Sequence, residues 1–332
     1  MIERLKLKNF TAFKELDMEF APGVNLFIGA NGTGKTHILK VMYGYLSGAV
    51  VLDIIGAIVD VFLPFGKDIS RLKHHRRQDH HSLVQIAGFK RGEEVEYELR
   101  ASKIVLRDDI IDSEIGQLIY IPVKEMLANA PGFLSLYALR QIHFEKIYQD
   151  ILVRAFLDPL RELPPEMQKL MAKLEKRIGG KVILRKETFF LKNKQGELEF
   201  DLLAEGLRKL ALLWLLIQNG GLSKGSVLFW DEPEANLNPE LLEPLVDVLL
   251  ELQRQGVQMF LATHDYALLK LFDLKKTEAD TVRFFSLFPD KEKGVGYTAS
   301  DGYLGTLPNP ISEASERLFV MEVQKGFKER RQ

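Results

Sequence analysis

The feature that most constrains the fold is the eight-residue segment GANGTGKT, Gly29 to Thr36, which directly follows the apolar run VNLFI. The segment matches the pattern G-x-x-x-x-G-K-[ST]. The apolar run predicts a short buried strand, and the pattern from Lys35 to about Leu46 predicts a helix. A strand, a glycine-rich turn and a helix in this order predict a P-loop α/β fold with a mainly parallel core sheet.

Such a turn is suited to hold phosphate groups, because glycines let successive backbone N–H groups point inward and the dipole of the following helix adds positive potential. Lys35 is placed to bridge the β- and γ-phosphates of a nucleotide, and Thr36 offers a hydroxyl to Mg²⁺. The competing interpretation is a strand–helix turn without a ligand. The predicted ATP-binding residues of this phosphate loop are Gly29, Ala30, Asn31, Gly32, Thr33, Gly34, Lys35 and Thr36.

Polar residues also follow two later apolar runs. Asp231 and Glu232 come directly after VLFW, and His264 follows VQMFLAT. At the carboxyl end of a strand beside a phosphate loop, Asp231 is suited to bind Mg²⁺ through a water, and Glu232 is suited to act as general base on the attacking water. His264 is placed to donate to the γ-phosphate or to hold that water. The competing interpretations are solvated acids at a strand end and a structural histidine.

Composition narrows the class of protein. The 332 residues carry a net charge of −1, so no overall positive field draws the chain to nucleic acid or to a membrane. The absence of cysteine excludes disulfides and thiolate metal sites and fits a reducing cytoplasm, where we expect the protein. The most apolar long stretch, Gly48 to Gly66, contains Asp53 and Asp60. It therefore predicts a buried helix and no membrane contact.

The chain is expected to form a single domain over residues 1–332, because no repeat, low-complexity segment or long linker divides it. RLKLKNF and KELDMEF alternate in polarity and predict an N-terminal antiparallel β subdomain, with RLKLKNF as an edge strand. The Arg91-Gly92 pair predicts a hairpin turn. The expected insertion spans about 66–204 and contains a β meander at 82–107, a helical lobe at 133–178 and a β unit at 181–200.

The order of these motifs resembles the head of an ABC-type ATPase. Within that class the chain more closely resembles the group around RecF, the SMC and double-strand-break-repair ATPases and the OLD (overcoming lysogenization defect) proteins. LKNFTAFKELDMEF…LFIGANGTGKT is similar to their N-terminal signature, VLFWDEPEANLNP to their Walker B and D-loop, and LATHD to their switch-histidine loop. The chain is also similar to bacterial AAA ATP-binding proteins related to OLD, which often act in phage defence or toxin–antitoxin systems.

The resemblance implies a signature motif just before Walker B that reaches across a dimer to the γ-phosphate bound by the other subunit. LLAEGLRK occupies that place, with Leu-Ala-Glu-Gly instead of the family's Leu-Ser-Gly-Gly. Glu205 adds a negative charge that would repel phosphate unless it bonds elsewhere, whereas Gly206 and the helix N-terminus favour a close approach. A core helix without a role in trans is the alternative. The candidate signature residues are Ala204, Glu205, Gly206 and Arg208, with Lys209 nearby.

The resemblance also implies a Q-loop site and an adenine-binding site. Many relatives carry a Q-loop glutamine after the strand that corresponds to QLIYIP, but this chain does not, and Lys124 or Glu125 is the candidate substitute. Adenine contacts are expected from the segment after the first strand, with Lys8 and Asn9 as candidates. Phe10 and Phe13 of the same segment are as readily explained as core residues as they are as adenine contacts.

The segment RLKHHRRQDHH, Arg71 to His81, is rich in arginine, lysine and histidine, whereas the chain as a whole has nearly equal numbers of acidic and basic residues. It is weak as a metal site, because it has no thiolates and no fixed helical spacing of its histidines. Two interpretations stay open, a solvated loop and a patch that contacts the phosphates of nucleic acid or a partner protein.

These features together predict a Mg²⁺-dependent, ATP-hydrolysing switch that forms a homodimer or higher oligomer around ATP. No long heptad region is present, and the length leaves no room for the nuclease domain of OLD proteins, so an effector protein is expected to act in trans. Phage defence, toxin–antitoxin function and DNA repair are the expected settings. The alternative is a module that binds nucleic acid or protein with negligible turnover. A transporter subunit is least favoured because of the altered signature.

Overall fold

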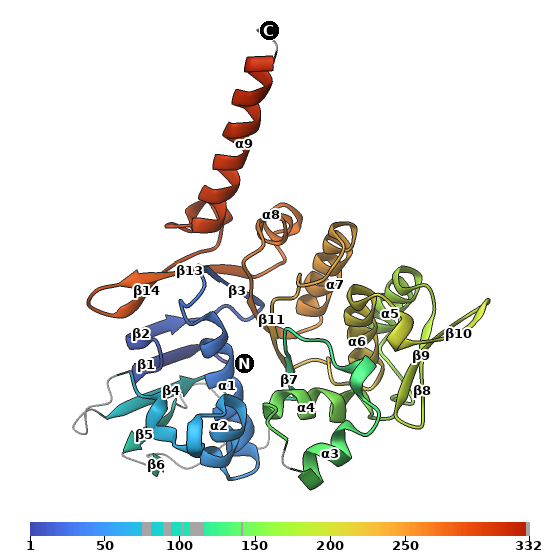
Figure 1. Cartoon of the computed structure of the whole chain (residues 1–332), viewed down its shortest axis with the longest axis horizontal. Helices are drawn as coiled ribbons and strands as arrows, with labels where there is room; N and C mark the ends of the chain where they lie inside the picture. The colour runs from blue at the N-terminus through green and yellow to red at the C-terminus, as the bar shows by residue number, and fades with distance from the viewer. Residues whose placement is uncertain (75–80, 89–93, 101–102, 107–115, 141, 330–332) are drawn as a thin grey trace.

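The computed structural model describes residues 1–74, 81–88, 94–100, 103–106, 116–140 and 142–329. At its centre lies a six-stranded sheet in which one edge strand is antiparallel to its neighbour and the others run parallel (Figure 1). In spatial order its strands are β14 (Gly294–Ser300), β13 (Val282–Asp290), β3 (Val24–Gly29), β12 (Gln258–Ala262), β11 (Val227–Asp231) and β7 (Leu118–Ile121). The predicted α/β fold with a mainly parallel core sheet is confirmed.

A second, antiparallel sheet covers one side of the molecule. Its strands, in spatial order, are β2 (Phe13–Glu19), β1 (Arg4–Phe10), β4 (Ser82–Ala87), β5 (Glu94–Arg100) and β6 (Lys103–Leu106). The prediction that RLKLKNF forms an edge strand is wrong, because β1 pairs with β2 on one side and β4 on the other. Alternating polarity reports that one face of a strand is buried, but it does not report whether the strand's hydrogen-bonding edges are paired. Arg91-Gly92 lies outside the described residues.

The stretch from Gly48 to Gly66 is not the single buried helix that its composition predicts. Helix α1 (Lys35–Val50) extends into this stretch, and α2 (Ile54–Phe62) starts after a break at which Leu52 has a φ of 57°. Asp53 makes the break, because its carboxylate accepts a hydrogen bond from the backbone N–H of Gly56 and so caps the second helix.

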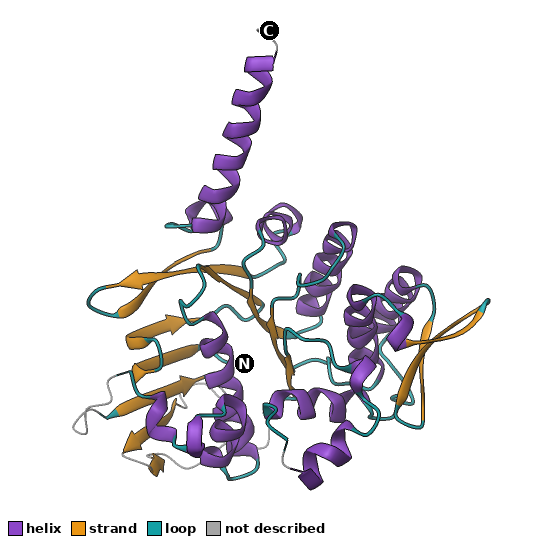
Figure 2. Ribbon diagram, in the orientation of Figure 1, coloured by secondary structure: helices purple, strands orange, loops and turns teal. Residues whose placement is uncertain are grey.

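The remaining described elements follow in chain order. The longer helices are α3 (Phe133–Arg140), α4 (Lys146–Ala155), α5 (Pro165–Ile178), α6 (Glu205–Gln218), α7 (Leu242–Arg254), α8 (Tyr266–Lys275) and α9 (Pro310–Glu329). A small antiparallel sheet contains β8 (Lys181–Arg185), β9 (Thr188–Asn193) and β10 (Gly196–Glu199). Short 3₁₀ turns lie at Phe65–Lys67, Ile69–Leu72, Leu127–Asn129, Phe200–Leu202, Pro239–Leu241 and Tyr303–Gly305. Helices flank the central sheet, and α9 projects from the body (Figure 2).

Aromatic side chains form a row across one face of the central sheet. The rings of Phe285, Phe27, Phe260, Phe229 and Tyr120 come from five successive strands, and neighbouring ring centroids are 5.3, 6.4, 5.3 and 6.3 Å apart. This aromatic row packs against α1 and the second sheet, whereas the intervening residues of the same strands pack against helices on the opposite face. Both faces are therefore buried, as the continuous apolar runs of these strands require.

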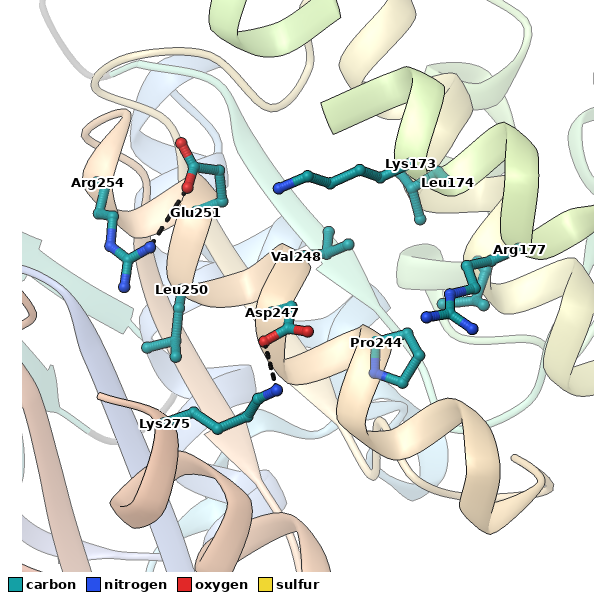
Figure 3. A pocket seen from close by; sticks show the side chains of 11 residues that line it. Lys173, Leu174, Arg177, Pro244, Asp247, Val248, Leu250, Glu251, Arg254 and Lys275 are labelled. Carbon is teal, nitrogen blue, oxygen red and sulfur yellow. Dashed lines mark hydrogen bonds and ion pairs between the residues drawn. The ribbon is translucent and has the colours of Figure 1, made fainter. Parts of the chain in front are cut away.

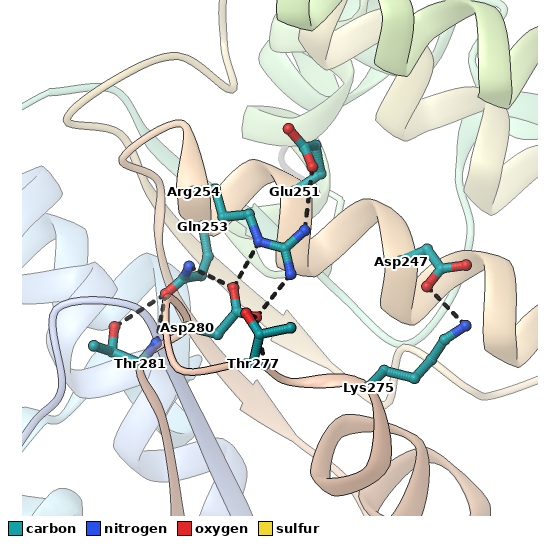
Figure 4. A network of polar contacts seen from close by, with 8 residues as sticks. All are labelled: Asp247, Glu251, Gln253, Arg254, Lys275, Thr277, Asp280 and Thr281. Atoms are coloured by element: carbon teal, nitrogen blue, oxygen red, sulfur yellow. Dashed lines mark hydrogen bonds and ion pairs between the residues drawn. The ribbon is translucent and has the colours of Figure 1, made fainter.

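A polar network holds the loop between α8 and β13 against α7 (Figure 4). Arg254 donates from Nε and Nη2 to the two carboxylate oxygens of Asp280 at 2.8 and 2.7 Å, and the backbone N–H of Thr277 donates to the same carboxylate. Burial alone would raise the pKa of Asp280, but hydrogen bonds from Arg254 and Thr277 outweigh burial and hold this pKa below its usual value. The network fixes where β13 starts beside β3.

The aromatic row should contribute strongly to stability. Phe229 is fully buried, so Phe229→Ala should lower the free energy of unfolding by about 3–5 kcal/mol through lost burial and an unfilled cavity. Urea unfolding measures this change. Phe65→Ala is the matched control, because Phe65 is 82% exposed and should change the free energy by less than about 1 kcal/mol. Equal effects of the two substitutions would contradict the packing described above.

Acid should weaken the Asp280 network. Because the pKa of Asp280 is lower in the folded chain than its unfolded value near 3.9, its contribution to stability is present at neutral pH and is lost below about pH 4. Urea unfolding at several pH values should show a smaller acid-induced loss of stability for Asp280→Asn than for the wild type. Asp301→Asn is the control, because that side chain is 87% exposed, and it should retain the wild-type pH dependence.

Candidate functional site

The predicted site residues meet at the carboxyl-terminal edge of the central sheet. Strand β12 lies between β3 and β11, with Asp231 in register with Ala262 and Ala262 in register with Phe27. Beyond the strand ends, the N–H of Glu232 donates to the carbonyl of Ala262 at 2.8 Å, and the N–H of Thr263 donates to the carbonyl of Phe27 at 3.0 Å. Three segments that are far apart in sequence are thereby joined at one edge.

The phosphate loop has the expected strand–turn–helix form. Gly34 has a φ of 84° and precedes the first residue of α1, a conformation that favours glycine. The Lys35 ammonium donates to the carbonyls of Gly29 at 2.8 Å and Ala30 at 3.1 Å, so the lysine lies across its own loop. Burial lowers the pKa of Lys35, and the nearby carboxylates, that of Asp231 foremost, oppose this shift.

Thr36 and Asp231 carry oxygen atoms of the kind that Mg²⁺ prefers as ligands. The side chain of Thr36 is hydrogen-bonded to the carboxylate of Asp231, and Asp231 is only 6% exposed. Burial raises the pKa of Asp231, whereas the hydrogen bond with Thr36 lowers it. Mg²⁺ binds through one or two protein oxygens together with nucleotide phosphates, and this pair fits that requirement. Among the described residues no group of three or more His, Cys, Asp or Glu forms a separate metal site.

Glu232 and His264 lie close together beside this pair. His264 Nδ1 is 3.3 Å from Glu232 Oε1, and both side chains are accessible to solvent, with exposed fractions of 51% and 32%. Glu232 has a φ of 50°, in the left-handed region that non-glycine residues rarely occupy. The turn after β11 therefore presents the carboxylate at the same edge of the sheet as the phosphate loop.

Glu234 is a site residue that the sequence analysis did not single out. Its Oε1 accepts hydrogen bonds from Thr263 Oγ1 at 2.7 Å and from the N–H of His264 at 3.2 Å. The side chain is 8% exposed, and burial raises the pKa of Glu234. It ties the turn after β11 to the loop after β12. The only signal in the sequence was a third acid in DEPE, two residues beyond Glu232.

The turn between β1 and β2 packs against the phosphate loop. A Cβ added to Gly34 would lie 2.6 Å from the ring of Phe13, so glycine is required for this close approach. Phe10 and Phe13 are fully buried and belong to the core. Of the two proposed adenine contacts, Lys8 is exposed, whereas Asn9 is buried and donates to the carbonyl of His81 at 3.4 Å.

The altered signature segment starts α6 and packs against the loop after β11. Asn236 Nδ2 donates to Glu205 Oε1 at 3.0 Å, which gives Glu205 a partner within its own chain. A Cβ on Gly206 would lie 3.0 Å from the carbonyl oxygen of Asn236, so this glycine permits a close approach to that loop. Lys209 is 2% exposed and donates to the carbonyls of Ala235 at 2.6 Å and Glu232 at 3.3 Å.

The Q-loop candidate Glu125 also contacts α6. Its carboxylate lies 2.7 Å from Arg208 Nε, and its side chain is 1% exposed. Burial raises the pKa of Glu125, while the backbone N–H of Leu127 and the charge of Arg208 oppose this rise. Arg208 is therefore engaged within the subunit. The other candidate, Lys124, lies 6.0 Å from the ring centroid of Phe144.

The basic segment Arg71–His81 lies only in part within the described residues, because 75–80 fall outside them. His74 Nδ1 is 2.9 Å from the carbonyl oxygen of Thr11, and the N–H of His74 donates to the carbonyl of Asn9. The first part of the segment thus packs beside the turn between β1 and β2.

One cavity lies beside the phosphate loop, and a larger one lies away from it. One of about 420 Å³ adjoins the phosphate loop and is lined by residues of that loop, of the His264 loop and of the start of α9. Another of about 580 Å³ lies between α5, α7 and α8, with Lys173 and Arg177 on one wall and Asp247 and Glu251 on another (Figure 3). The larger cavity contains none of the predicted site residues.

Comparison with protein families matches two parts of the chain. A family described as "AAA ATPase domain" matches residues 1–76, and one described as "AAA domain, putative AbiEii toxin, Type IV TA system" matches residues 119–270. Among curated proteins, the DNA replication and repair protein RecF of Clostridium kluyveri is 55% identical over 42 residues, which are 13% of this chain and 12% of that protein. RecF of Halalkalibacterium halodurans is 50% identical over 42 residues, 13% of this chain and 11% of that protein. The chain therefore covers only a small part of these relatives.

Solved structures resemble the chain over most of its length. An SMC head bound to the C-terminal winged-helix domain of ScpA has a TM-score of 0.58 at 16% identity and covers 92% of this chain and 98% of its own. The SMC head of Thermotoga maritima has a TM-score of 0.50 at 14% identity, with 90% and 98% covered. At these identities the likeness shows the fold. Within the described part of the chain, none of the helices is both long and apolar enough to cross a bilayer.

The Glu125–Arg208 pair should behave as a buried ion pair. Arg208→Ala should lower the free energy of unfolding by about 3 kcal/mol or more, because it leaves a buried carboxylate without its counter-charge. The double variant Glu125→Gln/Arg208→Ala should recover part of this loss, and comparison with Glu125→Gln and Arg208→Ala alone should give a coupling of about 1–3 kcal/mol in urea unfolding.

The control for this pair is Arg185→Ala. Arg185 forms a surface pair with Glu197 at 2.8 Å, and its loss should cost no more than about 1 kcal/mol. Strictly additive effects of the Glu125 and Arg208 substitutions would show that the two side chains are not coupled.

Proposed function

Because the chain belongs to the ABC-type ATPases of the RecF/SMC/OLD-like group, we propose that it is a Mg²⁺-dependent ATP-hydrolysing switch that dimerises around ATP and controls an effector. The observation that carries this proposal is the meeting of Lys35, Thr36, Asp231 and Glu232 at one edge of the sheet, at the N-terminus of α1. We also propose that the whole chain acts as a single ATPase domain with an insertion over about 66–204, in the cytoplasm.

In ATP binding, the residues Gly29 to Thr36 would receive the triphosphate. The backbone N–H groups of the loop and the dipole of α1 favour anionic oxygens, and Lys35 would exchange its contacts with the loop carbonyls for phosphate oxygens. Thr36 and Asp231 would hold Mg²⁺, which would neutralise charge on the phosphates. Lys8 and Asn9, near the end of β1, are the proposed neighbours of the adenine, because the turn that follows β1 packs against the phosphate loop.

In hydrolysis, Glu232 would take a proton from the attacking water. Its carboxylate is accessible, and His264 Nδ1 lies 3.3 Å from Glu232 Oε1. The imidazole would therefore orient either the Glu232 carboxylate or the water that lies between Glu232 and the γ-phosphate. Glu234 positions the His264 loop through Thr263 and the N–H of His264. The strained φ of Glu232 keeps the base at the end of β11, beside the phosphate loop.

In the dimer, the start of α6 would face the nucleotide of the other subunit through Ala204, Glu205, Gly206 and Arg208. Support for this arrangement is that Glu205 has a partner in Asn236, which reduces its repulsion of phosphate. Arg208 is held by Glu125, so the helix N-terminus would contribute more than the guanidinium.

The effector and the pathway are proposed from the relatives. RecF is named for DNA replication and repair, and one matching family is described as a putative toxin of a type IV toxin–antitoxin system, so a role in phage defence, toxin–antitoxin function or DNA repair is proposed. The SMC head binds ScpA, and here an effector protein would bind in trans. Contact with nucleic acid would involve Arg71–His81. The alternative is a module that binds nucleic acid or protein with negligible turnover.

Two variants test the proposal. Lys35→Ala should weaken Mg²⁺-dependent ATP binding by about 10-fold or more, because it removes a charged hydrogen-bond donor, whereas the exposed Lys194→Ala should bind normally. Glu232→Gln should still bind ATP while its turnover falls by about 10²- to 10⁴-fold. Equilibrium binding with a fluorescent ATP analogue and a phosphate-release assay measure these changes.

The outcomes separate the two functions. Turnover by the wild type, together with an ATP-bound dimer of Glu232→Gln, supports the switch. Binding without hydrolysis in both proteins supports the binding module. Undiminished ATP binding by Lys35→Ala would refute the nucleotide site itself.

A further inference from the structure

A cavity of about 460 Å³ lies toward the end of α1 that is remote from the phosphate loop. Its walls come from the second half of α1, from α2, from the start of β7 and from α4 with the residues that follow it. We call it the α1–α4 cavity. Its volume is within the range of about 300–1,000 Å³ that is typical of sites for small molecules.

Part of the wall is apolar and open to solvent. Val50 and Val51 at the end of α1 are 60% and 66% exposed, and Val153 and Leu157 on the α4 side are 43% and 45% exposed. Apolar side chains that remain in water lower the free energy of the system when an apolar group covers them. Their grouping around one cavity favours a ligand with an apolar body.

Charged groups line the same cavity. The carboxylate of Asp150 on α4 is already paired, because it accepts hydrogen bonds from the hydroxyl of Tyr43 at 2.7 Å and from the ammonium of Lys146. Arg154, one turn further along α4, donates to the side-chain oxygen of Gln117 but forms no ion pair within the described part of the chain. The acid in the wall therefore has its counter-charge, whereas the arginine does not.

The charge of Arg154 acts on a buried part of the wall. Burial and the charge of Asp150 raise the pKa of Tyr43, and the charge of Arg154 opposes this rise. Tyr43 is only 4% exposed, so the guanidinium lies near a hydroxyl that solvent scarcely reaches. An anion paired with Arg154 at this place is screened less than it would be on an open surface.

We propose that the α1–α4 cavity binds an amphipathic anion, a small molecule that has an apolar body and one acidic group. The acidic group pairs with Arg154, and the apolar body covers Val50, Val51 and Val153. The site is separate from the proposed nucleotide site, because α1 places about 22 Å between Lys35 and Val50. The inference therefore does not depend on the proposed function.

Two fluorescent probes test the proposal. Anilinonaphthalene sulfonate has an apolar body and one acidic group, and phenylnaphthylamine has the same body without the acid. The sulfonate should bind the wild type saturably, and the neutral probe should bind about tenfold more weakly or less, because it cannot form the charged hydrogen bond. Arg154→Gln should weaken binding of the sulfonate by about tenfold or more and leave the neutral probe within about twofold. Val51→Asp should weaken the binding of both probes.

Arg161→Gln is the matched control, because Arg161 is an exposed arginine that does not line the cavity, and it should bind both probes as the wild type does. Damage to the fold would raise the emission of the sulfonate, because it exposes apolar surface, so weaker binding by Arg154→Gln reports the site itself. Sulfonate binding at wild-type strength by both Arg154→Gln and Val51→Asp, or equal affinity of the wild type for the two probes, would overturn the proposal.

Discussion

The parallel register of β3, β12 and β11 is the constraint on which the rest of the structure depends. Hydrogen bonds between these strands bring the phosphate loop, the paired acids and the histidine loop to one edge, although the phosphate loop lies about 200 residues before the other two in the sequence. The aromatic row fixes the same alignment from one face, because rings from successive strands pack against one another. A slip of one residue would turn each side chain to the other face.

The turn after β11 connects the site to the signature helix. Lys209 of α6 donates to two carbonyls of this turn, and Gly206 lets the helix approach Asn236. On the other side of α6, Arg208 pairs with Glu125 in the segment that follows β7. The first turns of α6 are therefore held by buried polar contacts, which cost much free energy if they are broken singly. A displacement of α6 would therefore shift the turn that contains Glu232 and the segment after β7, because α6 contacts both.

Whether the role of a residue can be predicted from the sequence depends on where its contact partners lie in the chain. The phosphate loop could be recognised because its glycines and Lys35 perform their roles within eight successive residues. Glu234 could not, because its role comes from contacts with Thr263 and His264 on another strand. The position of β1 inside its sheet and the break at Asp53 were likewise missed, since composition does not report strand partners or a capping hydrogen bond.

The sequence by itself determined the α/β class, the phosphate loop and the strand-end positions of Asp231, Glu232 and His264, because local spacing and apolar runs specify strand, turn and helix. Only the tertiary structure decided which partners the charged residues have. Arg208 and Lys209 look equally available to a phosphate in sequence, yet one is paired with Glu125 and the other is buried against backbone carbonyls. Partner choice depends on distance and burial between segments remote in the chain, and these quantities exist only once the chain has folded.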